Sequence, residues 1–234
     1  VDAARLVDGV QGLAEALGDG RSIDAAASAD ELLAALHEGR AATLTVQHQP
    51  TTYTVEYGDT LTRIAWKTGI PFWRILDANP GIDVDTLSVG QVINLPSRSD
   101  LLPLPVVPDK RIVVSIGQQH LWIYENGQLI REEVISTGIE DSPTQPGVFQ
   151  VQSHEINAYA SAWDLWMPHF MGIYEASPGF MNGIHGLPLL SSGVRLWGNV
   201  LGSPASYGCI IMTLAEAEEL YMWADEGTVV EIQP

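Results

Sequence analysis

A single cysteine and an upstream histidine are the residues of this sequence best suited to do chemistry. Cys209 is the only cysteine among the 234 residues, so it has no partner for an internal disulfide. Gly208 permits a tight backbone turn beside the sulfur, and His185 stands in a similar setting between Ile184 and Gly186. A thiolate attacks carbonyl carbons, and a nearby imidazole can take the thiol proton and return it to a leaving amine. Two such residues facing one cleft would suit acyl transfer.

Structural roles are the alternative for both residues. A lone cysteine often packs as a small buried hydrophobic side chain, and His185 would then be a hydrogen-bonded histidine. Short motifs of this kind also arise by chance. Local sequence alone therefore leaves catalysis and packing open.

The arrangement of His-Gly followed by Ser-x-Gly-Cys-Ile resembles the signature of the L,D-transpeptidase catalytic domain, the YkuD-type family of bacterial cell walls. The resemblance extends over roughly Arg111 to Ile232. It includes three further motifs: Ser136-Thr137-Gly138, Pro143-Thr144-x-Pro146-Gly147-x-Phe149 and Met167-Pro168-x-Phe170-Met171. Two positions depart from the family, since many members have His where this chain has Tyr207, and Asn or Arg where it has Ile211. The stretch between histidine and cysteine is also long, owing to the insert from Leu187 to Ala205.

The resemblance implies that Cys209 is the nucleophile and His185 the general acid–base. The thiolate would attack the carbonyl that joins the third residue of a peptidoglycan stem to a terminal D-alanine, which would leave. An amine of a neighbouring stem would then resolve the thioester into a 3–3 cross-link, and carbapenems would acylate the same cysteine. This chemistry requires no metal and no organic cofactor.

Four neighbouring residues are expected to support the pair. Backbone N–H groups around Tyr207, Gly208 and Cys209 are the expected oxyanion donors, because preorganised dipoles stabilise the developing charge. Ser206 would support the turn or bind substrate, and Gly186 marks a backbone carbonyl that would orient the imidazole. Tyr207 is not expected to act as the base, because a phenol has a pKa of about 10. The pH–rate profile is therefore expected to show one group in the histidine range.

Other functions stay open at this point. A non-catalytic wall-binding protein that keeps the fold is favoured by the departures at Tyr207 and Ile211. A carboxypeptidase that uses water as acceptor is a second alternative, and attachment of a protein to the wall is a third.

The segment 52–96 shows a strand, two short helices and a returning strand, and this βααβ order closely resembles a LysM domain. That module holds glycans that contain N-acetylglucosamine. The resemblance implies a shallow groove between two loops, formed by Gly58, Asp59, Thr60, Asn79, Pro80, Gly81 and Ile82. Each of these residues has an alternative role as a helix cap or turn former.

The domain order follows from these segments. Residues 1–50 read as a small α/β piece, in which Ser28 is a candidate helix cap and 41–48 a candidate strand; it resembles part of a wall-associated domain. The LysM domain covers 52–96, a Pro-rich linker covers 97–110, and the catalytic domain covers 111–234. The expected fold is multidomain and mainly β, with a sandwich or barrel as the catalytic domain, in which 163–173 forms core and cleft wall.

Composition excludes several classes of partner. The net charge of −18, from 29 acidic and 11 basic residues, would repel nucleic acid. No apolar run reaches the ~18–20 residues of a membrane-spanning helix, and no signal peptide is present in this sequence. The histidines lack the spacing of a zinc site.

The expected partners are peptidoglycan stem peptides and glycan strands, which place the protein in the cell wall or periplasm, or outside the cell.

Overall fold

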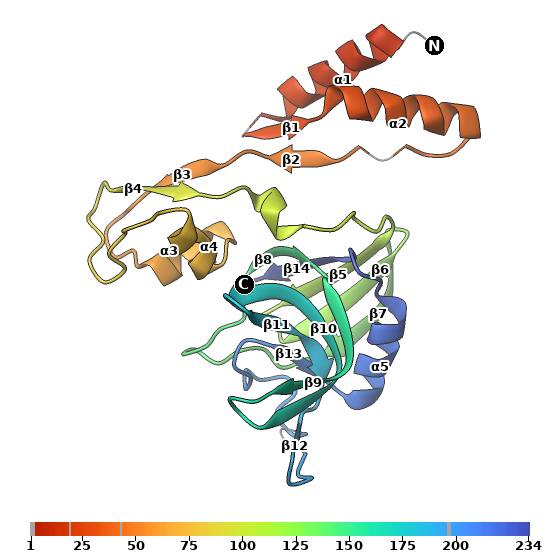
Figure 1. The fold of residues 1–234 in the computed structure, drawn as a ribbon. Helices are drawn as coiled ribbons and strands as arrows, with labels where there is room; N and C mark the ends of the chain where they lie inside the picture. Colours follow the sequence, from red (N-terminus) through yellow and green to blue (C-terminus); the bar gives the residue numbers. More distant parts are fainter. Residues whose placement is uncertain (1–2, 19, 43, 196–197) are drawn as a thin grey trace.

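A computed structural model describes residues 3–18, 20–42, 44–195 and 198–234 (Figure 1). Its helices are α1 (Ala3–Leu17), α2 (Ala25–Glu38), α3 (Leu61–Thr68), α4 (Phe72–Asp77), the 3-10 helix η1 (Arg98–Leu101) and α5 (Leu214–Trp223). The first strands are β1 (Arg21–Ile23), β2 (Val46–His48), β3 (Thr51–Thr54) and β4 (Val92–Leu95). The remaining strands are β5 (Lys110–Ser115), β6 (His120–Glu125), β7 (Gln128–Val134), β8 (Gly147–Gln150), β9 (Ser153–Ala160), β10 (Leu165–Ser177), β11 (Phe180–Gly186), β12 (Leu189–Leu190), β13 (Ile210–Met212) and β14 (Val229–Gln233).

The N-terminal segment packs two helices beside a short antiparallel pair, β1 with β2. Helix α2 begins earlier than expected, because the Asp24 side chain caps it by accepting from Ala27 N, while Ser28 is buried inside the helix. The expected strand over 41–48 is shorter, since only Val46–His48 pairs, and residue 43 lies outside the described residues. Helix α1 and helix α2 lie at the far end of the molecule from the C-terminal domain (Figure 1).

The LysM segment has the expected βααβ order. Strands β3 and β4 pair antiparallel, and the two short helices lie between them in sequence. Thr60 caps α3 by accepting from Arg63 N, and Gly69 ends it in the left-handed conformation. Buried residues of both helices, of β4 and of the positions just after β3 and α3 form one small core: Val55, Leu61, Ile64, Ala65, Ile70, Ile75, Ile93 and Leu95.

The C-terminal domain is a sandwich of two sheets, which confirms the mainly β prediction. One sheet has the order β7-β6-β5-β14-β8, and the other has the order β12-β10-β11-β13 with β9 paired to β10. Both sheets contribute buried side chains to a shared core that includes Ile112, Leu121, Phe149, Met171, Ile184 and Ile210. Burying one face of each sheet removes a large apolar area from water and holds the two sheets together.

Helix α5 closes one side of this sandwich. Thr213 caps it by accepting from Glu216 N, and the Glu216 side chain accepts in return from Thr213 N. Its buried residues Ala217 and Leu220 join the sandwich core. Because α5 packs against β10 and β11, it supports the strand that carries His185.

The proline-rich linker lies along the catalytic domain. It contains η1, and Leu101 is buried in the core of the sandwich. The backbone of Leu104 exchanges two hydrogen bonds with the Gln150 side chain, and Val107 N donates to Gly227 O. These contacts order the linker and fix where the LysM domain joins the sandwich.

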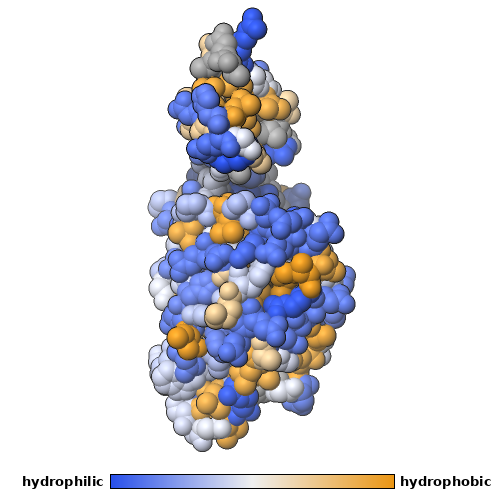
Figure 2. Space-filling view, turned by 90° about the vertical axis from the view of Figure 1, so that its right-hand side faces the viewer, coloured by the Kyte–Doolittle hydropathy of each residue, from blue (hydrophilic) through white to orange (hydrophobic). Residues whose placement is uncertain are grey.

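The surface is mixed in character. Figure 2 shows small hydrophobic patches set among hydrophilic residues on the face that it presents. Within the described residues, no helix is both long and apolar enough to cross a membrane.

Candidate active site

His185 and Cys209 are brought together by two parallel strands. His185 lies near the end of β11, and Cys209 immediately precedes β13. The strands pair in parallel with Ile184 opposite Ile210, so Cys209 lies at the start of the strand beside the histidine. Both residues line one cavity with Ser206, Tyr207, Ile211 and aromatic and apolar side chains of β9–β11, among them Trp163, Leu165 and Met167. The expectation that 163–173 provides cleft wall is confirmed for these three residues.

The imidazole of His185 is buried and held in one tautomer. Its side chain is only 3% exposed, and the Phe170 ring stacks on it at 6.1 Å between centroids. Nδ1 lies 2.7 Å from the Gly186 carbonyl oxygen. A carbonyl only accepts hydrogen bonds, so Nδ1 carries the proton and Nε2 is left as the basic nitrogen. Burial lowers the pKa of His185 to about 4, against the opposing effect of the Gly186 carbonyl, so the ring is neutral near neutral pH.

The thiol of Cys209 is also neutral at rest. Burial raises its pKa to about 11, while a backbone hydrogen bond from Gly183 acts in the opposite direction. Sγ lies 3.6 Å from the Oδ1 atom of Asn182. The resting pair is therefore a thiol and a neutral imidazole, and not a thiolate–imidazolium ion pair.

The turn before Cys209 is fixed by two hydroxyl groups. Ser206 Oγ donates to the Cys209 carbonyl oxygen at 2.5 Å and accepts from Gly208 N at 3.1 Å. Thr144 Oγ1 donates to the Gly208 carbonyl oxygen at 2.9 Å. Gly208 has φ of +107°, and a Cβ on it would lie 2.5 Å from Asn182 Nδ2, so only glycine fits there.

This turn changes the expected set of oxyanion donors. The Gly208 N–H already donates to Ser206 Oγ, so it is committed to holding the turn. In the described part of the chain, no acceptor is found for the Cys209 N–H. The Cys209 amide is thus the better placed of these two donors for a developing oxyanion.

The residues expected to bind glycan mostly hold the LysM loops in shape. Asp59 accepts from Lys67, Tyr53 and Glu56, and this network lowers its pKa to about 2, with the Lys67 hydrogen bond as the largest cause. Thr60 caps α3, and Asn79 bonds through its side chain to three backbone groups. Ile82 packs against the LysM core.

The two glycines of the expected glycan groove lie in open surroundings. Gly58 and Gly81 have φ of +81° and +85°, and a Cβ on either would meet no atom within 4 Å. The space above both loops is therefore open to a ligand.

Asn182 is a further residue of the site, in addition to those that the motifs predict. Its Nδ2 atom donates to the Tyr174 hydroxyl at 3.0 Å, and that hydroxyl also accepts from Gln145 N. Burial is the main cause that raises the pKa of Tyr174 to about 12. The feature of the sequence that could have pointed to Asn182 is a polar residue on an otherwise buried strand, three positions before His185.

Comparisons with known proteins agree with this architecture. The family model described as the L,D-transpeptidase catalytic domain, YkuD, matches residues 109–232, and the LysM domain model matches residues 53–96. A protein of Bacillus licheniformis named "Putative L,D-transpeptidase YkuD" is 29% identical over 78% of this chain and 98% of its own length. Its counterpart in Bacillus subtilis strain 168 is 30% identical over 77% of this chain and 98% of its own length.

Solved structures include similar chains. A crystal structure of an L,D-transpeptidase (Yku) from Stackebrandtia nassauensis is 21% identical, with a TM-score of 0.44, over 56% of this chain and 58% of that chain. The catalytic-domain match, which covers more than half of the residues, confirms the resemblance inferred from the motifs around His185 and Cys209. The chain therefore belongs to the YkuD family of L,D-transpeptidase catalytic domains and carries a LysM domain ahead of it.

Proposed function

We propose that this protein is a peptidoglycan L,D-transpeptidase that forms 3–3 cross-links through a thioester on Cys209. The observation that carries the proposal is the pairing of a neutral thiol with a histidine whose Nδ1 is tied to the Gly186 carbonyl, in one cavity. Such an imidazole has its basic Nε2 available to accept the thiol proton. Family membership supplies the class of substrate.

In the first half-reaction the thiol proton of Cys209 passes through His185 to the leaving amine, and an S–C bond replaces the C–N bond to D-alanine. The pKa of about 11 for Cys209 and about 4 for His185 make a free ion pair costly, so proton transfer accompanies formation of the S–C bond. The Cys209 N–H stabilises the oxyanion on the donor carbonyl. The C–N bond to D-alanine then breaks, and the leaving amine takes its proton from His185.

The second half-reaction runs the same steps with a new amine. A neutral amine of an acceptor stem attacks the thioester carbonyl, and His185 takes the proton that this amine loses. The C–S bond breaks, and the departing sulfur recovers the proton from His185 as the thiol. Atoms and charges therefore balance without a cofactor.

The LysM domain is proposed to hold the glycan strand that carries the stems, which would place the protein at the cell wall. The open space above Gly58 and Gly81 supports this assignment. Backbone groups of those loops are available to sugar hydroxyls, since side chains such as Asp59 and Asn79 are engaged within the domain.

Intact-mass measurement with a stem tetrapeptide tests the proposal. Wild type should gain the mass of the tetrapeptide less D-alanine, and an amine acceptor should discharge that adduct into a cross-linked product. Cys209→Ala should form no adduct with the tetrapeptide or with a carbapenem. Discharge by water alone would favour a carboxypeptidase, and absence of any adduct in wild type would favour a wall-binding protein.

A further inference from the structure

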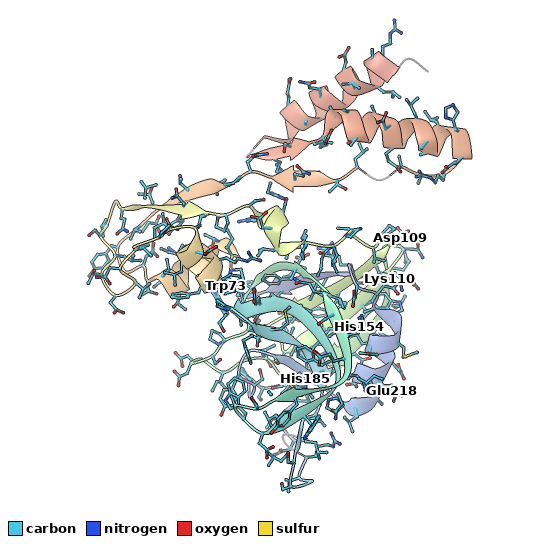
Figure 3. The ribbon with its side chains drawn as sticks, in the orientation of Figure 1. Trp73, Asp109, Lys110, His154, His185 and Glu218 are labelled. Atoms are coloured by element: carbon cyan, nitrogen blue, oxygen red, sulfur yellow. The ribbon has the colours of Figure 1, made fainter. Side chains whose placement is uncertain are left out.

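A second cavity lies where the LysM domain meets the catalytic domain. Its volume is about 390 Å³. One wall comes from the LysM helices, through Thr62, Pro71 and Phe72, and the other comes from the catalytic domain. Figure 3 shows Trp73, the residue after Phe72, at this junction between the small helical domain and the sandwich.

Direct contacts fix the two walls of this interdomain cavity. Trp73 Nε1 donates to the Glu175 carbonyl oxygen at 2.6 Å, and Gln145 Nε2 donates to the Ala65 carbonyl oxygen at 2.9 Å. The backbones also pack closely, because a Cβ on Gly69 would lie 3.2 Å from the Cα atom of Gly147. The interdomain cavity is therefore a built feature of the fold.

The interdomain cavity adjoins the active site. Trp163, Phe180 and Tyr207 line both this cavity and the one that holds His185 and Cys209. The Trp163 and Tyr207 rings stack at 5.5 Å between centroids, so one aromatic pair separates the two spaces. Asn182, whose Oδ1 lies 3.6 Å from the Cys209 sulfur, also lines the interdomain cavity.

The charge in the lining of the interdomain cavity favours a cation, and it comes from an exposed residue. Asp141 is the single charged side chain among the described residues that line it. Its loop is tied to the catalytic turn, because the next residue, Ser142, donates through Oγ to the Tyr207 carbonyl oxygen at 3.1 Å. Carboxylates bind ammonium groups through charge-assisted hydrogen bonds, and aromatic faces such as those of Phe72 and Trp163 also attract cations.

The cavity at Cys209 has the opposite character. It is small, and its lining is apolar and aromatic apart from the reacting residues and Ser206. An ammonium group would lose its hydration there without a carboxylate to replace it. An ammonium group therefore has its better site on the interdomain side.

We propose that the interdomain cavity binds the amine-bearing acceptor stem, with Asp141 holding its ammonium group as the stem docks and the LysM helices forming one wall. Asp141 is exposed, so the ammonium group releases one proton to solvent before the neutral amine attacks the thioester. This rests on the proposed transpeptidase function, because only that reaction requires an amine acceptor. The LysM domain would then contribute to the acceptor site directly, in addition to any contact with glycan.

Binding titrations with two peptides test the role of charge. The probe is a stem tripeptide that ends in lysine and so lacks the D-alanine of a donor; its partner is the same peptide acetylated on the ε-amine. Asp141→Asn should weaken binding of the free-amine peptide about tenfold and leave the acetylated peptide unchanged. Glu140→Gln removes the neighbouring exposed carboxylate, which does not line the interdomain cavity, and should change neither. Equal effects of the two variants would overturn the proposal.

A bulky substitution tests the LysM wall. Thr62→Trp should fill the interdomain cavity and weaken binding of both peptides at least tenfold. Thr54→Trp places the same side chain on an exposed LysM strand position outside the cavity and should bind both peptides like wild type. Unchanged binding in Thr62→Trp would overturn the proposal.

The rate of acylation by a donor tetrapeptide distinguishes a failure of the acceptor-site proposal from a failure of the proposed transpeptidase function. Asp141→Asn and Thr62→Trp should acylate at the wild-type rate while the KM for the acceptor rises. A slower acylation in both variants would assign the interdomain cavity to the donor and overturn the acceptor assignment. The peptide titrations do not depend on turnover, so they decide the binding site even if wild type forms no thioester.

Discussion

The side chains of Asn182 and Cys209 face each other at the centre of the site, with Oδ1 and Sγ 3.6 Å apart. A hydrogen bond on the side away from the sulfur fixes the orientation of the Asn182 amide: its Nδ2 atom donates to the Tyr174 hydroxyl at 3.0 Å. The oxygen is thus presented to the sulfur. An amide oxygen accepts from a thiol and offers nothing to a thiolate, so this contact stabilises the resting thiol.

Substitution of Asn182 should change the ionisation of the thiol. Asn182→Asp places a negative charge near the sulfur, which should raise the pKa of Cys209 further and slow acylation by about tenfold or more. Asn182→Ala removes the acceptor without adding charge and should slow acylation less. The measurements are the alkylation rate of Cys209 against pH and the rate of acylation. The same alkylation profile in both variants would show that Asn182 has only a packing role.

Loss of the imidazole should slow acylation. His185→Ala removes the group that accepts the thiol proton and should lower the rate by ~10²–10⁴-fold. The acid limb of the wild-type pH–rate profile should fall near pH ~4, because burial lowers the pKa of His185. The sequence alone predicts a titration in the usual histidine range, and the measured pH–rate profile distinguishes the two predictions. A limb at the ordinary histidine pKa would mean that the ring becomes solvated when substrate binds.

Stability should fall at both ends of the pH range. The folded pKa of His185 is lowered from 6.5 to about 4, so the unfolded chain binds more protons there and stability is lost as pH falls through that window. The folded pKa of Cys209 is raised from 9.0 to about 11, so stability is lost as pH rises between those values. Each loss should be on the order of 3 kcal/mol.

Urea unfolding at acid, neutral and alkaline pH checks these two losses. Compared with wild type, His185→Gln should lack the acid loss and keep the alkaline one, whereas Cys209→Ala should show the reverse. Titrating groups remote from the site are common to all three proteins and cancel in the differences. Tyr174 is the exception, because the charge of Cys209 contributes to its raised pKa, so the alkaline difference belongs to the two residues together. Wild-type pH dependence in both variants would contradict the burial argument.

Tyr207→Phe should retain most acylation activity. The ring of Tyr207 stacks on Trp163 and is 43% exposed, and phenylalanine keeps that stacking face. Its hydroxyl is not expected to transfer the proton, because a phenol is a weak base near neutral pH. Single-turnover acylation by a tetrapeptide is the measurement. A loss as severe as that of His185→Ala would show that the roles assigned to the two residues are wrong.

Wall binding by the LysM domain can be tested with a pair of glycines. Gly81→Asn adds a side chain to the expected groove at a φ of +85°, a conformation that asparagine tolerates. Gly90 has the same φ and equally open surroundings but lies outside the expected groove, so Gly90→Asn is the control. Only the Gly81 variant should lose sedimentation with purified peptidoglycan, by about fivefold or more. Equal sedimentation of both would place the glycan elsewhere.

The sequence by itself determined the family, the mainly β class and the two candidate reacting residues. These follow from local patterns: Gly208 beside Cys209, His185 between Gly183 and Gly186, and the βααβ order of 52–96. Such patterns arise because particular backbone conformations require particular residues and because buried residues recur with the period of a helix or strand. Both can be recognised in the sequence without a structure.

Tertiary structure alone decided the protonation states and the partners of the site. Parallel pairing of β11 with β13 brings His185 beside Cys209, and burial lowers the pKa of His185 while it raises that of Cys209. The contact of Asn182 with the sulfur joins positions far apart in sequence, so no local pattern could show it. The interdomain cavity likewise exists only because LysM residues such as Phe72 meet Trp163 across a packed junction.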